Sequence, residues 1–213
     1  MHIDFQNLTS MPEQIFFLFC NVIVLVATFA VIAAVLLDFS QFQKRSFVKK
    51  EKKSIIETGT MFLFFFLFYY LLRFKIGQVN FPLVAPRIIV TTVGSFLIIA
   101  GGFVNVRGRF NLGKNWSNQI KIYQDHYLVS SGVYHFVRHP LYGSIIWMFF
   151  GASLVYLNYL ALLSNVLIFI PAMYFRAKQE EKMLMQEFPE YKEYQKRVGM
   201  FFPKFLNKKY EKV

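Results

Sequence analysis

The chain has 213 residues, of which 55% are hydrophobic and only 17% charged, and its formal net charge is +12. Soluble domains carry roughly 25% charged residues, so this composition argues against a soluble protein. A single cysteine, Cys20, excludes an intrachain disulfide and a cysteine-based metal cluster. The basic residues lie between apolar segments and not along one polar face. We therefore expect no nucleic-acid partner, although a high positive charge can serve one.

Apolar segments long enough to cross a bilayer, which takes about 20 residues, recur along the chain. The first contains no charged residue, and no lysine or arginine precedes it, which argues against a cleaved signal peptide. The third carries Gly94, Gly101 and Gly102, which allow close helix contacts. A short turn at Asn158 joins the last two as a helical hairpin. The expected helices cover residues 14–37, 57–72, 88–106, 141–156 and 160–175.

The basic residues predict how these helices are oriented. If the spans alternate in direction, 21 of the 24 lysines and arginines fall on one side of the membrane and 3 on the other. Because connecting segments rich in lysine and arginine stay in the cytoplasm, we expect the N-terminus outside and the C-terminus inside. The polar segments 107–142 and 176–204 then lie on the same cytoplasmic side, and the hairpin between them brings their ends together. Any site is expected there.

The predicted fold class is an all-α integral membrane protein with about five transmembrane helices, completed by a cytoplasmic C-terminal helical tail. We expect two regions, an N-terminal set of three helices in residues 1–106 and a functional region in residues 107–213. Basic residues of the tail, such as Lys204, Lys208 and Lys209, are expected to contact membrane lipids with anionic headgroups. The oligomeric state cannot be predicted from these patterns.

Three ordered motifs lie in the second region: "LGKNWS" at 112–117, "DHYLVSSGVYHFVRHPLYG" at 125–143 and "RAKQEEKMLMQEFPEYKEYQKRVGMFFP" at 176–203. In order and spacing they resemble the isoprenylcysteine carboxyl methyltransferase family, whose C-terminal pattern is shared with phospholipid methyltransferases. The resemblance covers about residues 107–204. It implies a membrane-embedded methyltransferase that uses S-adenosylmethionine. The expected methyl acceptor is a lipid-like or prenylated molecule, with a carboxylate as the favoured acceptor group.

The residues of these motifs suit such a cofactor. No G-x-G-x-x-G motif follows a predicted strand, so a Rossmann-type cofactor domain is not expected. Tyr134 and Tyr142 offer ring faces to a sulfonium, an interaction of roughly 1–2 kcal/mol when desolvated. Glu180 offers a carboxylate, and His139 a ring that titrates near neutral pH. The resemblance implies cofactor contacts at Gln119, His126, Tyr127, Leu128, Val129, Tyr134, His139, Pro140, Leu141, Tyr142 and Glu180.

Arg176 matches the family position that faces the methyl acceptor, so it is the expected catalytic residue. It precedes Glu180 by four residues, which places both on one helix face, and its guanidinium could hold a carboxylate by a forked hydrogen bond. The simpler alternative is an exposed salt bridge between these two residues. An amine acceptor would require a general base, for which Glu181 and His126 are conceivable.

Two other functions and a metal site are alternatives. The chain could be a phospholipid or other lipid amine N-methyltransferase, or a membrane protein that binds a ligand without catalysis. Arg138 could simply anchor the chain at the lipid headgroups. His135 and His139 are spaced as a pair of metal ligands, but no third ligand lies nearby in the sequence, so no metal is expected.

Overall fold

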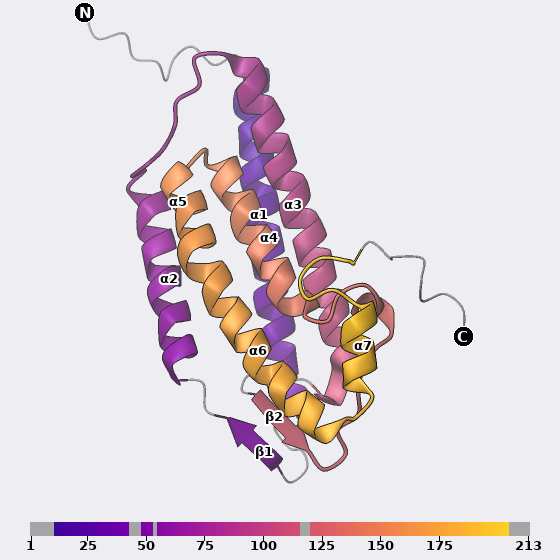
Figure 1. Ribbon diagram of the computed structural model, residues 1–213. Coiled ribbons are helices and arrows are strands. Elements are labelled where there is room, and N and C mark those ends of the chain that lie inside the picture. Colours follow the sequence, from indigo (N-terminus) through magenta and orange to yellow (C-terminus); the bar gives the residue numbers. More distant parts are fainter. Residues whose placement is uncertain (1–10, 43–47, 53–54, 116–119, 205–213) are drawn as a thin grey trace, which may run out of the picture.

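The structure, a computed structural model, describes residues 11–42, 48–52, 55–115 and 120–204 as a bundle of long helices with a small two-stranded sheet at one end (Figure 1). Its longer elements are α1 (Met11–Phe42), β1 (Val48–Lys52), α2 (Ile55–Arg73), α3 (Val84–Leu112), β2 (Ile120–Tyr123), α4 (Pro140–Val155), α5 (Tyr159–Ser164), α6 (Ile170–Glu187) and α7 (Tyr191–Arg197). Short turns of 3-10 helix, η2 (Gly113–Asn115) and η3 (Gly132–His135), and a π-helical turn, η4 (Asn165–Phe169), complete the described elements.

All of the expected apolar helices are present, with different boundaries. Three helical stretches of the described chain are long and apolar enough to span a membrane: Met11–Leu37, Val84–Leu112 and Tyr159–Glu187. Gly59–Arg73 and Pro140–Val155 form shorter apolar helices. The all-α membrane class is therefore confirmed, whereas a count of five complete spans stays a prediction. The division at residue 106 also stays a prediction, and α3 runs through that point without a break.

The last helix is longer than the apolar pattern indicates. It continues through α5, η4 and α6 to Glu187, beyond the predicted end at residue 175. Hydrophobicity falls after residue 175, but the following residues are good helix formers, so the helix extends past the apolar segment. Consequently one continuous helical stretch carries the start of the third motif, from Arg176 onward, away from the apolar core.

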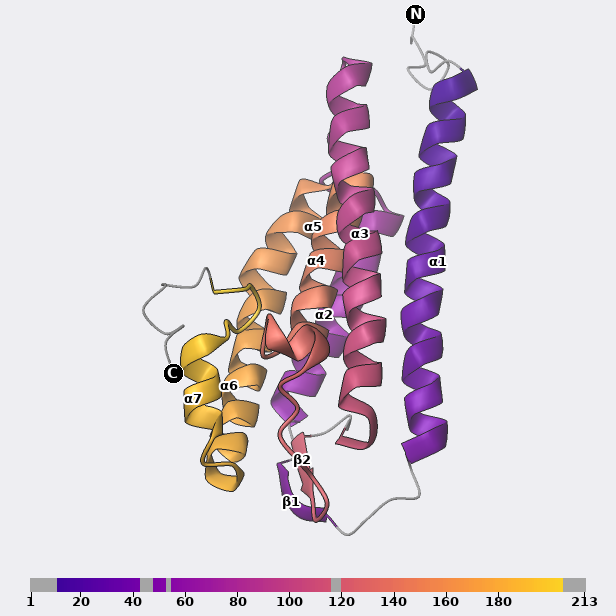
Figure 2. The same cartoon turned by 90° about the vertical axis from the view of Figure 1, so that its right-hand side faces the viewer.

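Glycines bring α3 and α4 into close contact. A Cβ atom at Gly94 would lie 2.6 Å from the carbonyl oxygen of Gly151, and one at Gly151 would lie 2.5 Å from the carbonyl oxygen of Gly94. Gly101 faces the backbone of Ser144 in the same way, at 2.8 Å. The predicted use of glycines for close helix contacts is confirmed at Gly94 and Gly101, where a side chain would push the helices apart, whereas a Cβ atom at Gly102 would meet only Ala27, at an ordinary 3.7 Å. Viewed from the side, α1 lies along the outer face of α3 (Figure 2).

The hairpin turn at Asn158 is also confirmed. The Asn158 side chain accepts a hydrogen bond from the amide of Ala161 at 2.9 Å, which caps α5. Its amide group donates to the carbonyl oxygens of Leu71 and Ile76, at 3.2 Å and 3.0 Å. One buried side chain thus ties the turn to the connection between α2 and α3. These two connections lie at the end of the bundle opposite the sheet (Figure 1).

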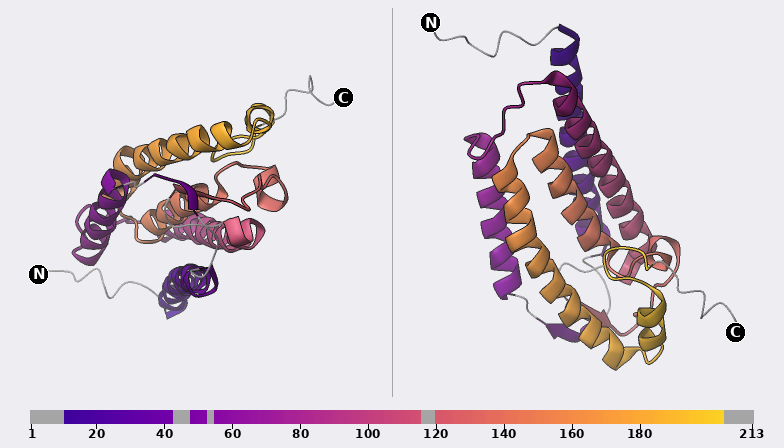
Figure 3. Two further views of the ribbon diagram at one scale, coloured as in Figure 1. Left: turned by 90° about the horizontal axis from the view of Figure 1, so that it is seen from below. Right: turned by 45° about the horizontal axis from the view of Figure 1, so that its top comes forward.

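At the other end, three segments that are distant in sequence meet. Strands β1 and β2 pair antiparallel, with Lys50 opposite Ile122 and Lys52 opposite Ile120. Helix α7 and the end of α6 lie at the same end (Figure 3). The sequence analysis did not predict the sheet, since strands of 5 and 4 residues carry too little periodicity to be recognised. Bringing the segments after α1, α3 and α6 to one end is what creates the site.

Candidate functional site

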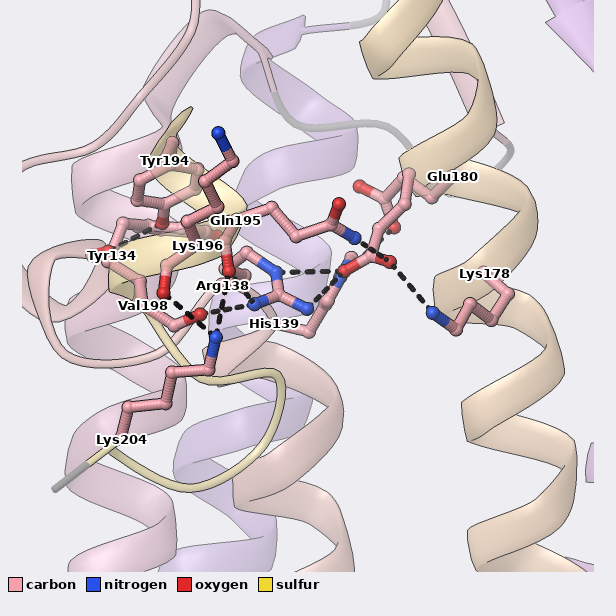
Figure 4. A network of polar contacts seen from close by, with 11 residues as sticks. Tyr134, Arg138, His139, Lys178, Glu180, Tyr194, Gln195, Lys196, Val198 and Lys204 are labelled. Carbon is pink, nitrogen blue, oxygen red and sulfur yellow. Dashed lines mark hydrogen bonds and ion pairs between the residues drawn. The ribbon is translucent and has the colours of Figure 1, made fainter. Parts of the chain in front are cut away.

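The core of the site is a buried ion pair between the two motif segments. Arg138 lies two residues before the start of α4. Its Nε and Nη2 atoms each lie 2.8 Å from Oε1 of Glu181 on α6. The side chains of Arg138 and Glu181 are 6% and 1% exposed. Gln195 of α7 donates to the second carboxylate oxygen of Glu181 at 2.9 Å. Glu181 therefore receives donors from two sides, and Figure 4 shows Arg138 and Gln195 within this network.

Arg138 also holds the chain that follows α7. Its Nη1 atom donates to the carbonyl oxygens of Gln195, at 3.1 Å, and Val198. The backbone amides of Arg138 and His139 donate to the carbonyl oxygens of Gly199 and Met200, at 2.8 Å and 3.0 Å. The expected meeting of segments 107–142 and 176–204 is therefore confirmed. The alternative in which Arg138 anchors lipid headgroups is wrong, because its guanidinium is buried in this network.

A cavity of about 330 Å³ lies beside this network. It is enclosed by α2, α3, α4, α6, α7 and the segment around residues 126–129. Every residue predicted to form the site lines it, apart from two. Gln119 lies outside the residues that the structure describes. Pro140 is buried at the first position of α4, where its fixed backbone angle suits a helix start, and its contact with a ligand stays a prediction.

The polar wall of the cavity centres on the hydroxyl of Tyr142. This hydroxyl donates a hydrogen bond to Oε2 of Glu180 at 2.9 Å and accepts one from Nε of Arg176 at 3.1 Å. The ring of His139 stacks on that of Tyr142, with centroids 5.5 Å apart and planes 11° apart. Arg176 is only 7% exposed. The alternative of an exposed salt bridge is therefore wrong for Arg176, which belongs to the cavity wall.

Two consecutive carboxylates flank His139. Its Nδ1 atom lies 3.6 Å from Oε2 of Glu180, and its Nε2 atom lies 3.3 Å from Oε1 of Glu181. Burial alone would lower the pKa of His139, but the hydrogen bonds and charges of Glu180 and Glu181 outweigh burial and raise the pKa above its ordinary value of 6.5. His139 is thus biased toward the charged imidazolium, which ties the two carboxylates together.

The other histidines behave differently. Burial lowers the pKa of His126, against the opposing charges of Glu180, Asp125 and Glu187, so the neutral imidazole is favoured in the cavity wall. His135 is exposed and His139 buried, so the two do not form a common site. Within the described residues, no group of three His, Cys, Asp or Glu side chains could hold a metal ion.

Some site residues were missed by the sequence analysis. Arg109 of α3 is 8% exposed and lines the cavity. Tyr191 and Tyr194 of α7 line it too, and the Tyr194 hydroxyl donates to the carbonyl oxygen of Tyr134 at 2.5 Å. Both tyrosines lie in the third motif, where Phe188, Tyr191 and Tyr194 follow one another at intervals of three, so their spacing was a usable signal. Asn115, from the "LGKNWS" motif, donates to the carbonyl oxygen of Tyr127 at 2.9 Å and fixes that part of the rim.

The glutamate that was a conceivable general base has another role. Glu181 is buried against Arg138 and does not line the cavity, whereas its neighbour Glu180 does. Its carboxylate is therefore an internal counter-ion and cannot reach a ligand. This leaves His126 as the conceivable base among the two considered.

A helical membrane protein whose bundle encloses a small-molecule cavity at one end is the class that this fold and site define. Within it, residues 92–186 match the model of the isoprenylcysteine carboxyl methyltransferase family. The resemblance inferred from the motifs is therefore confirmed for this part of the chain.

Curated relatives agree with this family. The chain is 36% identical over 118 residues to the protein-S-isoprenylcysteine O-methyltransferase of Saccharomyces cerevisiae, which corresponds to 53% of this chain and 48% of the yeast protein. It is 32% identical over 127 residues to a probable protein-S-isoprenylcysteine O-methyltransferase of Oryza sativa subsp. japonica, which corresponds to 58% of this chain and 66% of that protein. The chain thus spans about half the length of the yeast relative that it matches.

The fold is similar to a solved structure. The structure of the eukaryotic intramembrane Ras methyltransferase, an isoprenylcysteine carboxyl methyltransferase, superposes with a TM-score of 0.51 and 24% sequence identity. The match covers 71% of this chain and 53% of that one. At this identity the likeness supports the arrangement of the helices, which is that of a membrane protein.

Proposed function

We propose that this chain is a membrane-embedded methyltransferase that uses S-adenosylmethionine and methylates a carboxylate of a lipid-like or isoprenylcysteine-type acceptor. The observation that carries the proposal is that one cavity joins a polar wall to an apolar one. The polar wall holds Tyr142, Arg176 and Glu180, and the apolar wall holds Met61, Phe62 and Phe65 of α2. A charged cofactor and a lipid-like acceptor can therefore approach the same space from opposite directions.

The cavity fits the cofactor in size and chemistry. Its volume of about 330 Å³ falls within the range of roughly 300–1,000 Å³ that is typical of small-molecule sites. The rings of Tyr134 and Tyr142 supply aromatic surface for a sulfonium, and Glu180, whose side chain is 33% exposed, supplies an accessible carboxylate. Apolar residues such as Leu128, Val129 and Leu184 line the same space and suit a flat base.

The acceptor end borders on the lipid. Phe62 lines the cavity and is nevertheless 70% exposed, and Phe65 is 39% exposed. Residues that contact both the cavity and the outer surface of an apolar helix lie next to hydrocarbon when that helix is in a bilayer. An acceptor with an isoprenoid or acyl chain could keep its chain in the lipid while its polar end reaches Arg176.

The side chains act by holding and orienting the reactants. When bound, S-adenosylmethionine supplies an electrophilic methyl group on sulfur. The Arg176 guanidinium can fix an acceptor carboxylate by two parallel hydrogen bonds, while Tyr142 fixes Arg176. A carboxylate is ionised at neutral pH, so the reaction requires no general base, in keeping with Glu181 being held away from the cavity. Holding nucleophile and electrophile in line can remove a large part of the barrier, on the order of 7–11 kcal/mol.

A methyl-transfer assay with labelled S-adenosylmethionine tests this proposal. We expect the detergent-purified protein to methylate N-acetyl-S-farnesylcysteine, and to leave its carboxamide analogue unmethylated because that analogue lacks the ionised acceptor. Transfer to phosphatidylethanolamine in place of the carboxylate would instead establish a lipid amine methyltransferase. Binding of the cofactor without transfer to either acceptor would contradict the proposed acceptor class.

We also propose that the cavity faces the cytoplasm. The support is the asymmetry of 21 basic residues against 3 under the positive-inside rule. A reporter that is active only outside the cytoplasm, fused after Val213, should stay silent. Activity of that reporter would reverse the orientation and, with it, the side from which the cofactor enters.

A further inference from the structure

Residues 198–204, which follow α7, form a loop that we call the C-terminal strap. The strap runs away from the sheet, toward the apolar part of the bundle (Figure 2). The carbonyl oxygens of Gly199 and Met200 accept hydrogen bonds from the two backbone amides just before α4, which attaches the strap to that segment. The strap takes no part in the proposed reaction, which leaves its own function to be explained.

The strap is a compact loop that returns to α7. A Cβ atom at Gly199 would collide with the strap's own backbone, so the chain turns sharply there. At the other end, the Lys204 ammonium donates to the carbonyl oxygens of Gln195 and Lys196, at 3.2 Å and 2.9 Å, and Figure 4 shows Lys204 in this position. Residues 200–203 form the tip between these two attachments, and the tip carries no charged residue.

The tip rests on α4 with an aromatic ring outermost. The ring of Phe202 packs on the indole of Trp147, with centroids 5.8 Å apart and planes 31° apart. Beside this contact, the carbonyl oxygen of Phe201 approaches Gly143, where a Cβ atom would lie only 3.2 Å from it. Phe202 is nevertheless 64% exposed. An uncovered phenylalanine ring therefore lies on the outer surface of the bundle.

The contact with Trp147 places this ring at an apolar level of the bundle. Trp147 stands seven residues after Pro140, the first residue of α4, which corresponds to about 10 Å along the helix axis. None of the residues of α4 is charged. Tyr142, which lies between these two residues, contacts Arg176, and Arg176 is the first charged residue of α6. Phe202 therefore lies farther into the apolar part of the bundle than the level at which charged residues begin.

The polar groups around the tip suit a position at the membrane boundary. Non-helical backbone enters a bilayer only where its polar groups are paired or buried, and the carbonyl oxygens of Gly199 and Met200 are paired. Arg197 and Lys204, on either side of the tip, are exposed, and their long side chains can reach lipid headgroups. Aromatic rings next to basic residues are characteristic of segments at this boundary. A bilayer is thus the surface that the tip fits best.

We infer that the tip of the C-terminal strap inserts into the hydrocarbon beside α4, with Phe202 as the anchor, while α7 stays at the level of the headgroups. The strap then links the membrane to the segment before α4, which carries Arg138 and His139. The partner of this surface is the acyl region of the bilayer, so the tail re-enters the membrane at residues 200–203. This inference concerns membrane contact alone and goes beyond the proposed function.

Collisions of spin labels with paramagnetic reagents test the inference. The full chain is reconstituted in phosphatidylcholine vesicles with one nitroxide at Phe202→Cys, Phe96→Cys or Glu193→Cys, each in a Cys20→Ala background. Phe96, 69% exposed on the apolar α3, is the hydrocarbon control, and Glu193, exposed on α7, is the aqueous control. We expect the ratio of oxygen to nickel-chelate collisions at Phe202→Cys to match that at Phe96→Cys and to exceed that at Glu193→Cys by at least about tenfold, because hydrocarbon excludes a polar chelate. A ratio equal to that at Glu193→Cys would overturn the inference.

Two substitutions of Phe202 test the same inference without a label. Phe202→Asp and Phe202→Asn both remove the ring from Trp147 and differ mainly in charge. A carboxylate is unfavourable in hydrocarbon, so Phe202→Asp should unfold at a thermal midpoint lower than that of Phe202→Asn by roughly 3 °C or more in the same vesicles. In water, two residues from the basic Lys204, the carboxylate would not lower the midpoint. Equal midpoints, or a higher one for Phe202→Asp, would contradict insertion and leave Phe202 as a surface for a soluble partner.

Discussion

Glu180 and Glu181 are neighbours on α6, yet they belong to two regions of opposite character. Glu181 is 1% exposed and is held by Arg138, Gln195 and His139, so its region is a closed network. Glu180 is 33% exposed in its side chain and lines the cavity with Tyr142. Successive residues of a helix point about 100° apart, and this rotation separates the two carboxylates. The difference teaches that a paired-glutamate motif contains one structural residue and one that can reach a ligand.

Of the changes considered, breaking the closed network around Glu181 should lower the free energy of unfolding the most. Glu181→Gln, or Arg138→Met, leaves one buried charge without its partner, and we expect a loss of roughly 3–5 kcal/mol in the free energy of unfolding. Thermal or denaturant unfolding in detergent measures it. Glu193→Gln is the control, because Glu193 forms an exposed pair with Lys196 at 2.6 Å that should contribute less than about 1 kcal/mol. Equal stability of Glu181→Gln and Glu193→Gln would show that the network does not hold the fold.

Changing the open region should affect chemistry and leave the fold intact. Arg176→Lys keeps the charge but loses the planar fork, so we expect near-normal affinity for S-adenosylhomocysteine and a fall in methyl transfer of at least about tenfold, or roughly 1.4 kcal/mol in the barrier. Lys182→Arg, an exposed change on the same helix, is the control. Normal turnover by Arg176→Lys would remove Arg176 as the residue that orients the acceptor.

His139 contacts both glutamates, and its titration makes the stability of the folded protein depend on pH. Its pKa is raised above 6.5 by Glu180 and Glu181 after burial is overcome, so the charged form is favoured by folding. This contribution to stability is complete below pH 6.5 and is lost as the pH rises through the raised pKa. Unfolding midpoints measured across that window should fall for wild-type protein more steeply than for His139→Gln. Parallel profiles would mean that His139 is not charged in the folded protein.

The smallest effect is expected at the sheet. Glu187, at the end of α6, pairs with Lys49 and, at 3.2 Å, with Lys50 of β1. The side chains of Lys49 and Lys50 are 51% and 39% exposed to solvent, so salt should weaken these pairs. Glu187→Gln should increase amide hydrogen exchange in residues 48–52 at low salt, and the difference from wild type should vanish at high salt. Glu190→Gln, a nearby exposed change, should leave the amide exchange of residues 48–52 unchanged at both low and high salt. A difference independent of salt would contradict an electrostatic origin.

The sequence predicted much of this arrangement because its signals are local. The apolar segments and the spacing of four between Arg176 and Glu180 each act within one helix. What it missed depends on contacts across the chain. The partner of Arg138 lies 43 residues away, and Arg109 carries no local sign that separates it from the exposed Arg107. Which of two adjacent glutamates faces the cavity is likewise fixed by helix packing and not by spacing.

The most direct test of the central claim is the affinity of the cavity for the cofactor product. Calorimetric titration of S-adenosylhomocysteine into detergent-purified wild-type protein should reveal one binding site. Glu180→Gln should weaken that binding by roughly 1–3 kcal/mol, because a buried or partly buried polar partner is lost, whereas Glu190→Gln should bind as wild type does. The absence of binding to folded wild-type protein, or equal affinities of wild type and Glu180→Gln, would contradict the assignment of this cavity as the cofactor site.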